Sequence, residues 1–227
     1  MTKKYKRIIS IGAHPLDAEL MGGPMCLHYN SRGAKSTMYH VTTGRLENKD
    51  ATEEEKTAYL EGLNTQIKNV ADHLGCDVVQ KGYLSSNMPS ETEFIKVVYD
   101  YLKEEHADLV ITHHIGTMHD RHYYTHKCVT HAVKLLRNEG VSIDLLYGEN
   151  LEDLVGFVPT RYLQLTPDEV EQWFNALEKY DIFNGGVNTV PYVDYYRTMG
   201  RVRGLESGCP GFVKAYMHAG QITYSND

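Results

Sequence analysis

The sequence predicts an α/β protein with a Rossmann-like three-layer sandwich and a mostly parallel sheet. Short runs rich in isoleucine, valine and leucine alternate along the chain with longer segments whose apolar residues recur at helical spacing. Strands that alternate with helices of this length pair in parallel through right-handed crossovers. The chain of 227 residues has the length of one large α/β domain. We therefore expect residues 1–227 to form a single domain.

The first strand is expected at residues 5–12, YKRIISIG, which are rich in isoleucine and end at a glycine before a polar turn. A helix should begin near Pro24, since proline suits a first helical turn, and end at Gly33. Residues 35–43, KSTMYHVTT, form the second expected strand.

A helix that ends at Gly75 follows, because apolar residues recur at helical spacing before it, at Tyr59, Leu63, Ile67, Val70 and Leu74. The third strand is expected at residues 77–84 and an amphipathic helix at 91–105. Residues 108–114, DLVITHH, form the clearest buried strand.

A histidine-rich loop then leads into a helix near residues 123–138, and residues 142–148, SIDLLYG, form a further strand. A further helix is expected at residues 166–180. It opens with Thr166 as N-cap before proline, and Glu169 occupies the capping-box position.

Composition excludes several classes of protein. With 23 basic and 30 acidic residues and no long run of like charge, the chain is not expected to bind nucleic acid. The N-terminal apolar run is too short for a signal peptide, and no stretch of about 18 apolar residues predicts a membrane span. The widely spaced cysteines fit free thiols in a reducing compartment, so we expect a cytoplasmic protein. They are Cys26, Cys76, Cys128 and Cys209.

The polar turn after the first strand carries the first candidate site. A turn in this place lies at the carboxyl edge of a parallel sheet, where open α/β folds bind their ligands. His14 and Asp17 flank Pro15 there, so an imidazole and a carboxylate can converge on one point. One His with one Asp is part of a nitrogen and oxygen site for a divalent metal. The alternative is a loop histidine and a helix-capping aspartate.

The loop after the fourth strand is unusually rich in histidine. Half of the twelve histidines fall within nineteen residues: His113, His114, His119, His122, His126 and His131. Helical spacing places His122 and His126 on one face, where they could serve one metal, or one metal and an adjacent catalytic group. About half of the six, and His131 among them, are expected to be solvated instead.

These two segments resemble the PIG-L/LmbE family of zinc-dependent N-deacetylases. The family's first strand ends in AHPDDAE followed by Gly-Gly, and residues 13–23 are AHPLDAELMGG. Its fourth strand ends in Thr-His and leads to an H-x-D-H motif at a helix start, where residues 111–129 are ITHHIGTMHDRHYYTHKCV. The likeness extends through VTTG, the Leu-Gly helix end near residue 75 and YYRTMGRVRG near the C-terminus, so it covers most of the chain.

The resemblance implies a site that binds Zn²⁺ or another divalent metal. His14 and Asp17 look like the first two family ligands, and His126 looks like the third. His122 is then similar to the family histidine that polarises the substrate carbonyl. In the other alignment His119 and His122 fill the motif, with arginine in the aspartate position, and the third ligand is His122.

One family position is altered. The family's general base is the first aspartate of AHPDDAE, and in this chain that position is Leu16, which cannot accept a proton. By sequence, Glu19 and Asp120 are the nearest carboxylates that could replace it. Loss of a general base lowers the rate by a factor of about 10² to 10⁴. A slow enzyme can therefore remain.

The resemblance therefore implies a metal-dependent hydrolase that removes an acetyl or similar acyl group from the amine of an amino sugar or a related small conjugate. The alternative is a catalytically impaired member that binds a sugar or a partner without turnover. Arg197, Arg201 and Arg203 fit a solvated helix face, or contacts with an anionic substrate group or a second copy in a homo-oligomer.

Overall fold

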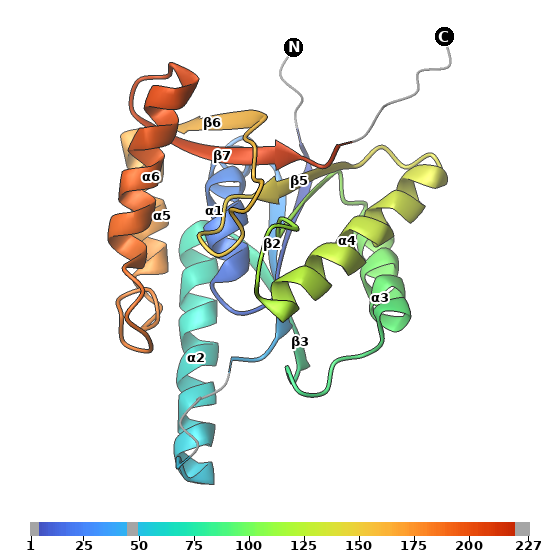
Figure 1. Cartoon of the computed structure of the whole chain (residues 1–227), viewed down its shortest axis with the longest axis vertical. Helices are drawn as coiled ribbons and strands as arrows, with labels where there is room; N and C mark the ends of the chain where they lie inside the picture. The colour runs from blue at the N-terminus through green and yellow to red at the C-terminus, as the bar shows by residue number, and fades with distance from the viewer. Residues whose placement is uncertain (1–4, 45–49, 221–227) are drawn as a thin grey trace.

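The computed structural model describes residues 5–44 and 50–220, which form one seven-stranded sheet flanked by six helices (Figure 1). The strands are β1 (Arg7–Gly12), β2 (Lys35–Thr42), β3 (Asp77–Tyr83), β4 (Leu109–Thr112), β5 (Asp144–Gly148), β6 (Arg161–Leu165) and β7 (Phe212–His218). The helices are α1 (Asp17–Asn30), α2 (Glu53–Leu74), α3 (Glu91–Glu104), α4 (Asp120–Asn138), α5 (Pro167–Leu177) and α6 (Tyr192–Ser207). The predicted α/β class with a mostly parallel sheet is confirmed.

The strand order is β3-β2-β1-β4-β5-β7-β6, and the first five strands in this order are parallel. Strand β7 runs antiparallel to both β5 and β6. These last two strands were not predicted, in part because the buried Lys214 interrupts the apolar pattern of β7. Since β1, β4 and β5 are neighbours, the loops that follow them leave the sheet side by side.

Helices cover both faces of the sheet. Helices α1, α2, α5 and α6 lie on one face, and α3 and α4 lie on the other (Figure 1). Each face has its own apolar core, the first including Trp173 and Phe174 and the second including Phe94 and Val98. This arrangement is the predicted three-layer sandwich.

Two helices begin earlier than predicted. Helix α1 starts at Asp17, because Asp17 and Glu19 supply the acidic first turn that a helix N-terminus favours. Pro24 therefore lies in the interior of the helix and not in its first turn. Helix α4 starts at Asp120 with His119 as its N-cap, three residues before the predicted start. The predicted capping box of Thr166 at the start of α5 is present.

No helix within the described part of the chain has the length and apolar character needed to cross a lipid bilayer.

A buried ion pair fixes the start of the loop after β5. Both Nε and Nη2 of Arg203 donate to Oε1 of Glu149, at 2.8 and 2.6 Å, and the Glu149 side chain is only 2% exposed. The Nζ of Lys214 donates to the Glu149 backbone oxygen at 2.8 Å. The contacts join α6 and β7 to the loop that carries part of the site described below.

We expect Glu149→Ala to lower the free energy of unfolding by about 3 kcal/mol, because removing one partner of a buried pair leaves the other charge uncompensated. Urea denaturation measures this effect. Glu206, whose side chain is 41% exposed, is the second carboxylate partner of Arg203 and provides the control. Glu206→Ala should change stability by less than about 1 kcal/mol. Equal effects of the two substitutions would contradict the account.

Candidate functional site

The turn between β1 and α1 holds its polar groups in a strained backbone. Leu16, the residue before the helix, has φ of 86° and is 3% exposed. A positive φ is unfavourable for a leucine and is tolerated better by aspartate or asparagine. The backbone N–H of His14 donates to Oδ2 of Asp17 at 2.8 Å, and the His14 ring lies 3.2 Å from the same oxygen.

The two segments predicted to meet do meet in space. The Asp17 Oδ2 atom lies 3.3 Å from Nε2 of His122 and 3.6 Å from Nε2 of His113. In each of two overlapping groups of three residues, one possible ligand atom from every residue lies within 4.8 Å of those of the other two. The groups are His14, His119 and His122, and Asp17, His113 and His122.

Asp153 orients two of these histidines. One carboxylate oxygen accepts from Nδ1 of His113 at 2.7 Å, and the other accepts from Nδ1 of His122 at 2.9 Å. The Nε2 atom of His113 then accepts the Ala13 N–H at 2.9 Å, so its lone pair is in use. The Nε2 atom of His122 faces Asp17 with its lone pair free when the ring is neutral. Of the two, His122 is therefore the one suited to bind a metal.

The charges of this cluster favour a cation. Burial acts to lower the pKa of His122, but the carboxylates of Asp17 and Asp153 outweigh burial and raise it to about 10. Burial acts to raise the pKa of Asp17, but His122 and His113 outweigh it and hold that pKa well below its usual value. Two carboxylates next to imidazoles that can give up a proton form a typical environment for a divalent metal.

His119 lies over the cluster as a neutral imidazole. Its ring stacks on that of His122, with 4.4 Å between centroids, and meets the His14 ring edge-on at 4.8 Å. Burial and the neighbouring His122 lower the pKa of His119 to about 4. Its Nδ1 accepts the backbone N–H of Arg121 at 3.3 Å, which leaves Nε2–H available as a hydrogen-bond donor.

The structure does not bring His126 to the cluster. The Nδ1 atom of His126 bonds to the backbone oxygen of His113 at 2.9 Å, and its ring packs on Tyr147 with 4.8 Å between centroids. His126 belongs to neither group of candidate ligands. The cause is the early start of α4, which places His122 in its first turn and His126 one turn further along.

The structure places the two carboxylates suggested by the sequence as a replacement base in different surroundings. Asp120 is exposed in the first turn of α4, and none of the ion pairs or hydrogen bonds recorded for the described residues involves its side chain. Glu19 is fully buried, where its Oε1 bonds to His40 Nε2 at 2.8 Å and accepts from the Tyr180 hydroxyl at 3.0 Å.

The loop after β5 supplies residues that sequence reasoning missed. Asn150 donates from Nδ2 to Oδ1 of Asp17 at 3.1 Å, and Asp153 orients His113 and His122. Glu152 places its Oε2 atom 3.8 Å from the Nε2 atom of His122. The signal for them was present, because the acidic run follows a predicted buried strand and so lies at the ligand-binding edge of the sheet.

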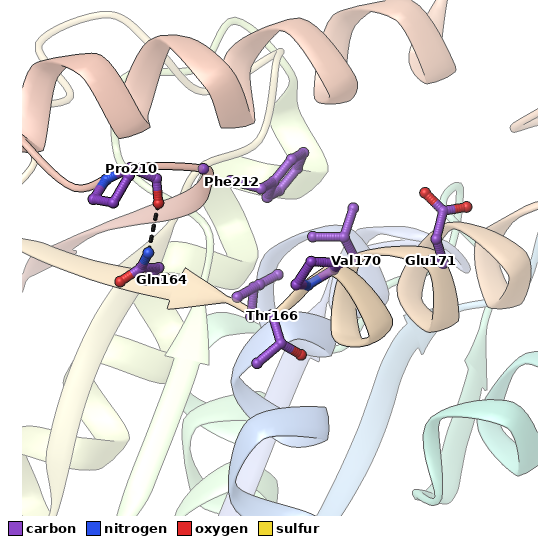
Figure 2. Close-up of a pocket in the computed structure, with 9 residues that line it drawn as sticks. Gln164, Thr166, Val170, Glu171, Pro210 and Phe212 are labelled. Carbon is purple, nitrogen blue, oxygen red and sulfur yellow. Dashed lines mark hydrogen bonds between the residues drawn. The ribbon is translucent and has the colours of Figure 1, made fainter.

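A separate pocket is lined by residues other than those of the histidine and aspartate cluster (Figure 2). It has a volume of about 750 Å³ and lies between the start of α5 and the turn that leads into β7. Thr166, Val170 and Phe212 line it, and the amide of Gln164 donates to the backbone oxygen of Pro210 (Figure 2). None of the histidines or aspartates of the cluster lines it, so it offers no metal site.

Comparisons with solved structures return the same fold over nearly the whole chain. The 4-carboxy-2-hydroxymuconate hydratase of Pseudomonas putida is 12% identical, with 97% of this chain and 99% of that chain covered and a TM-score of 0.78. The conserved protein TT1542 of Thermus thermophilus is 18% identical, with 97% of each chain covered and a TM-score of 0.76. The N,N'-diacetylchitobiose deacetylase of Pyrococcus horikoshii is 14% identical, with 94% of this chain and 84% of that chain covered and a TM-score of 0.73.

A comparison with curated protein sequences gives no significant match. The sequence profile of one family, described as PIG-L, GlcNAc-PI de-N-acetylase, matches residues 9–133. This range is more than half of the chain and includes the turn after β1, the histidine loop and the start of α4. The match agrees with the resemblance inferred from AHPLDAELMGG and from the histidines around α4. The chain therefore belongs to the PIG-L family.

Proposed function

We propose that this protein is a metal-dependent hydrolase that removes an acetyl or similar acyl group from the amine of an amino sugar or a related small conjugate. One observation carries the proposal: the Oδ2 atom of Asp17 lies 3.2 Å from Nδ1 of His14 and 3.3 Å from Nε2 of His122, which gathers two imidazoles and a carboxylate at the ligand-binding edge of the sheet. The family description and the deacetylases among the structural neighbours support the reaction class. The free cysteines fit the cytoplasm as its location.

The residues present fit a divalent metal, with Zn²⁺ as the first choice. Two imidazoles and one carboxylate match the three protein ligands of many catalytic zinc sites, which leave further positions open. Hydrogen bonds from outer residues orient such ligands, and here Asp153 holds His122 while Asn150 holds Asp17. A bound divalent cation supplies Lewis-acid chemistry, which polarises the amide carbonyl and lowers the pKa of a water.

The protein side chains would supply the remaining polar contacts. His119 is neutral at pH 7, stacks on His122 and has Nε2–H free, so we assign it the donor role toward the carbonyl oxygen as negative charge develops there. Sequence reasoning gave this role to His122 in one alignment, and in the other alignment His119 and His122 fill the motif. The geometry of α4 favours the second alignment, with His122 as the third ligand.

The reaction is tested by incubating the zinc-loaded protein with N-acetylglucosamine or N,N'-diacetylchitobiose and measuring release of free amine. We expect release that stops when a chelator removes the metal and returns when zinc is restored. A wild-type protein that releases no amine, or whose activity survives complete metal removal, would contradict the proposal.

Metal binding is tested separately by stability. We expect zinc at about 100 times its dissociation constant to raise the free energy of unfolding of the wild type by about 2.7 kcal/mol. Asp17→Asn should lose this increase, because it removes the anionic ligand, whereas Asp72→Asn on the exposed face of α2 should retain it. Denaturation with and without zinc gives the result, and an undiminished increase in Asp17→Asn would exclude Asp17 as a ligand.

Leu16 in the position of the family base favours a second candidate function, in which the pocket binds a sugar or partner without turnover. A Leu16→Asp variant separates the two. The binding function would be supported if the wild type binds zinc but releases no amine, while the Leu16→Asp variant does release amine. The φ of 86° at this position suits aspartate better than leucine, so the substitution fits the backbone.

A further inference from the structure

Four carboxylates lie near the cluster, and three of them are already engaged. Asp17 bonds to Asn150 and faces the imidazoles, and Asp153 uses both oxygens on His113 and His122. Glu19 is fully buried behind the turn, bonded to a histidine and a tyrosine of the core. Asp17 and Asp153 therefore have their oxygens in use, and the second oxygen of Glu19, which no hydrogen bond occupies, is enclosed in the core and closed to solvent.

Glu152 is the fourth carboxylate, and it is free. Its Oε2 atom lies 3.8 Å from Nε2 of His122, the nitrogen assigned to the metal. The side chain is 45% exposed, so it faces both the cluster and the solvent from which a substrate arrives. Within residues 5–44 and 50–220, no hydrogen bond occupies either of its carboxylate oxygens.

Hydrogen bonds within a tight turn hold Glu152 in position. Oδ1 of Asn150 accepts the backbone N–H of Glu152 at 3.2 Å, while the amide nitrogen of Asn150 donates to Asp17 at 3.1 Å. The backbone N–H of Asp153 donates to the Asn150 backbone oxygen at 2.9 Å. One asparagine therefore ties the turn that carries Glu152 to a proposed metal ligand.

Glu152 also lies outside the tight set of ligand atoms. It is near His122, but it is in neither group whose ligand atoms all lie within 4.8 Å of one another. A carboxylate beside the ligands, and not among them, is suited to hydrogen-bond a water at the centre without coordinating the metal. This is the place that a general base must occupy.

We propose that Glu152 is the general base of this chain and takes over the role that Leu16 cannot perform. The inference rests on the proposed deacetylation. The oxygen of the attacking water forms a bond to the amide carbonyl carbon, and the proton it loses passes to the Glu152 carboxylate. The C–N bond then breaks, the nitrogen leaves with the proton returned by Glu152, and the products are acetic acid and the free amine.

The test compares Glu152→Gln with the wild type and with Glu104→Gln, a matched change on the exposed end of α3. Zinc affinity is measured by competition with a chelator, kcat by amine release from N,N'-diacetylchitobiose, and binding of acetohydroxamate by calorimetry. We expect Glu152→Gln to keep its zinc affinity and to lose about 10² or more in kcat. Acetohydroxamate should bind about tenfold more weakly, because it loses the hydrogen bond that its hydroxyl would donate to the Glu152 carboxylate.

A double variant adds a readout that a structural role would not give. Leu16→Asp should restore most of the kcat lost in the Glu152→Gln background, since it returns a carboxylate to the family position, and should add little to the wild type. Glu104→Gln should match the wild type in all three measurements.

Two results would overturn the assignment of Glu152. In the first, Glu152→Gln has the same kcat and the same hydroxamate affinity as the wild type. In the second, Glu152→Gln loses zinc, which would make Glu152 a metal ligand. A wild type that binds zinc and acetohydroxamate but releases no amine overturns the proposed deacetylation instead. The hydroxamate comparison separates the two failures because it needs no turnover.

Discussion

Replacing His122 by alanine is expected to reduce kcat/KM by about 10³ or more and to remove tight zinc binding. The Nε2 atom of His122 faces Asp17 at 3.3 Å, and Asp153 fixes the orientation of the ring. Loss of a ligand that holds a catalytic metal removes several kcal/mol of transition-state stabilisation, and each 1.4 kcal/mol is about tenfold in rate. Zinc analysis of the purified variant and amine-release kinetics measure the two effects.

Two histidines of the same helix are the controls for this prediction. His131 is exposed on α4, so His131→Ala should leave zinc content and kcat/KM unchanged. His126 bonds to a backbone oxygen and packs on Tyr147, so His126→Ala should lower stability and leave zinc bound. Loss of zinc from His126→Ala with retention in His122→Ala would show that the third ligand is His126.

Replacing Asp153 by alanine is expected to lower the free energy of unfolding by about 3 kcal/mol or more and zinc affinity by about 10- to 100-fold. The Asp153 side chain is fully buried and accepts from two buried imidazoles, at 2.7 and 2.9 Å. Its removal leaves both Nδ1–H groups without their acceptor and frees the His122 ring to turn. Urea denaturation of the metal-free protein and chelator competition measure the two quantities.

Asp153→Asn separates orientation from charge. An amide keeps one acceptor oxygen of similar shape, so we expect a smaller loss of stability than for alanine, with zinc affinity still reduced because the negative charge is gone. Asp72→Ala, on the exposed face of α2, should stay within about 0.5 kcal/mol of the wild type. If Asp153→Ala behaved like Asp72→Ala in both assays, Asp153 would have no orienting role.

The sequence was informative where local patterns decide structure. Five strands and their crossover helices follow from runs of apolar residues and from glycine or proline at their ends, and these five form the parallel part of the sheet. The meeting of the turn at His14 with the histidine loop follows from the same reasoning, because both segments leave the carboxyl edge of neighbouring strands.

The sequence left the choice between His122 and His126 open because the family motif can be aligned in two ways, and the start of α4 bears on which histidine lies beside Asp17. A start at residue 123 puts His126 in the first turn of α4, whereas the observed start at Asp120 puts His122 there. Helix boundaries depend on capping, and here the side chain of His119 accepts the backbone N–H of Arg121. Because histidine is not among the residues usually found at an N-cap, the sequence did not indicate a helix start at this position. A shift of three residues therefore changed the candidate ligand.

Asp153 and Glu152 could not be assigned roles from sequence because their function depends on pairing across the fold. The contacts of Asp153 span 31 and 40 residues along the chain, and those of Asn150 with Asp17 span 133. No local periodicity encodes such distances. The strained φ of 86° at Leu16 is likewise set by the closure of the turn around His14 and Asp17.

The most direct test of the account is a crystal structure of the protein grown with zinc, with anomalous differences recorded at the zinc absorption edge. The account predicts one strong peak within bonding distance of His14, Asp17 and His122, with Asp153 still bonded to the far nitrogen of His122. A zinc ion held by His126, or no peak between the loops after β1 and β4, would contradict it.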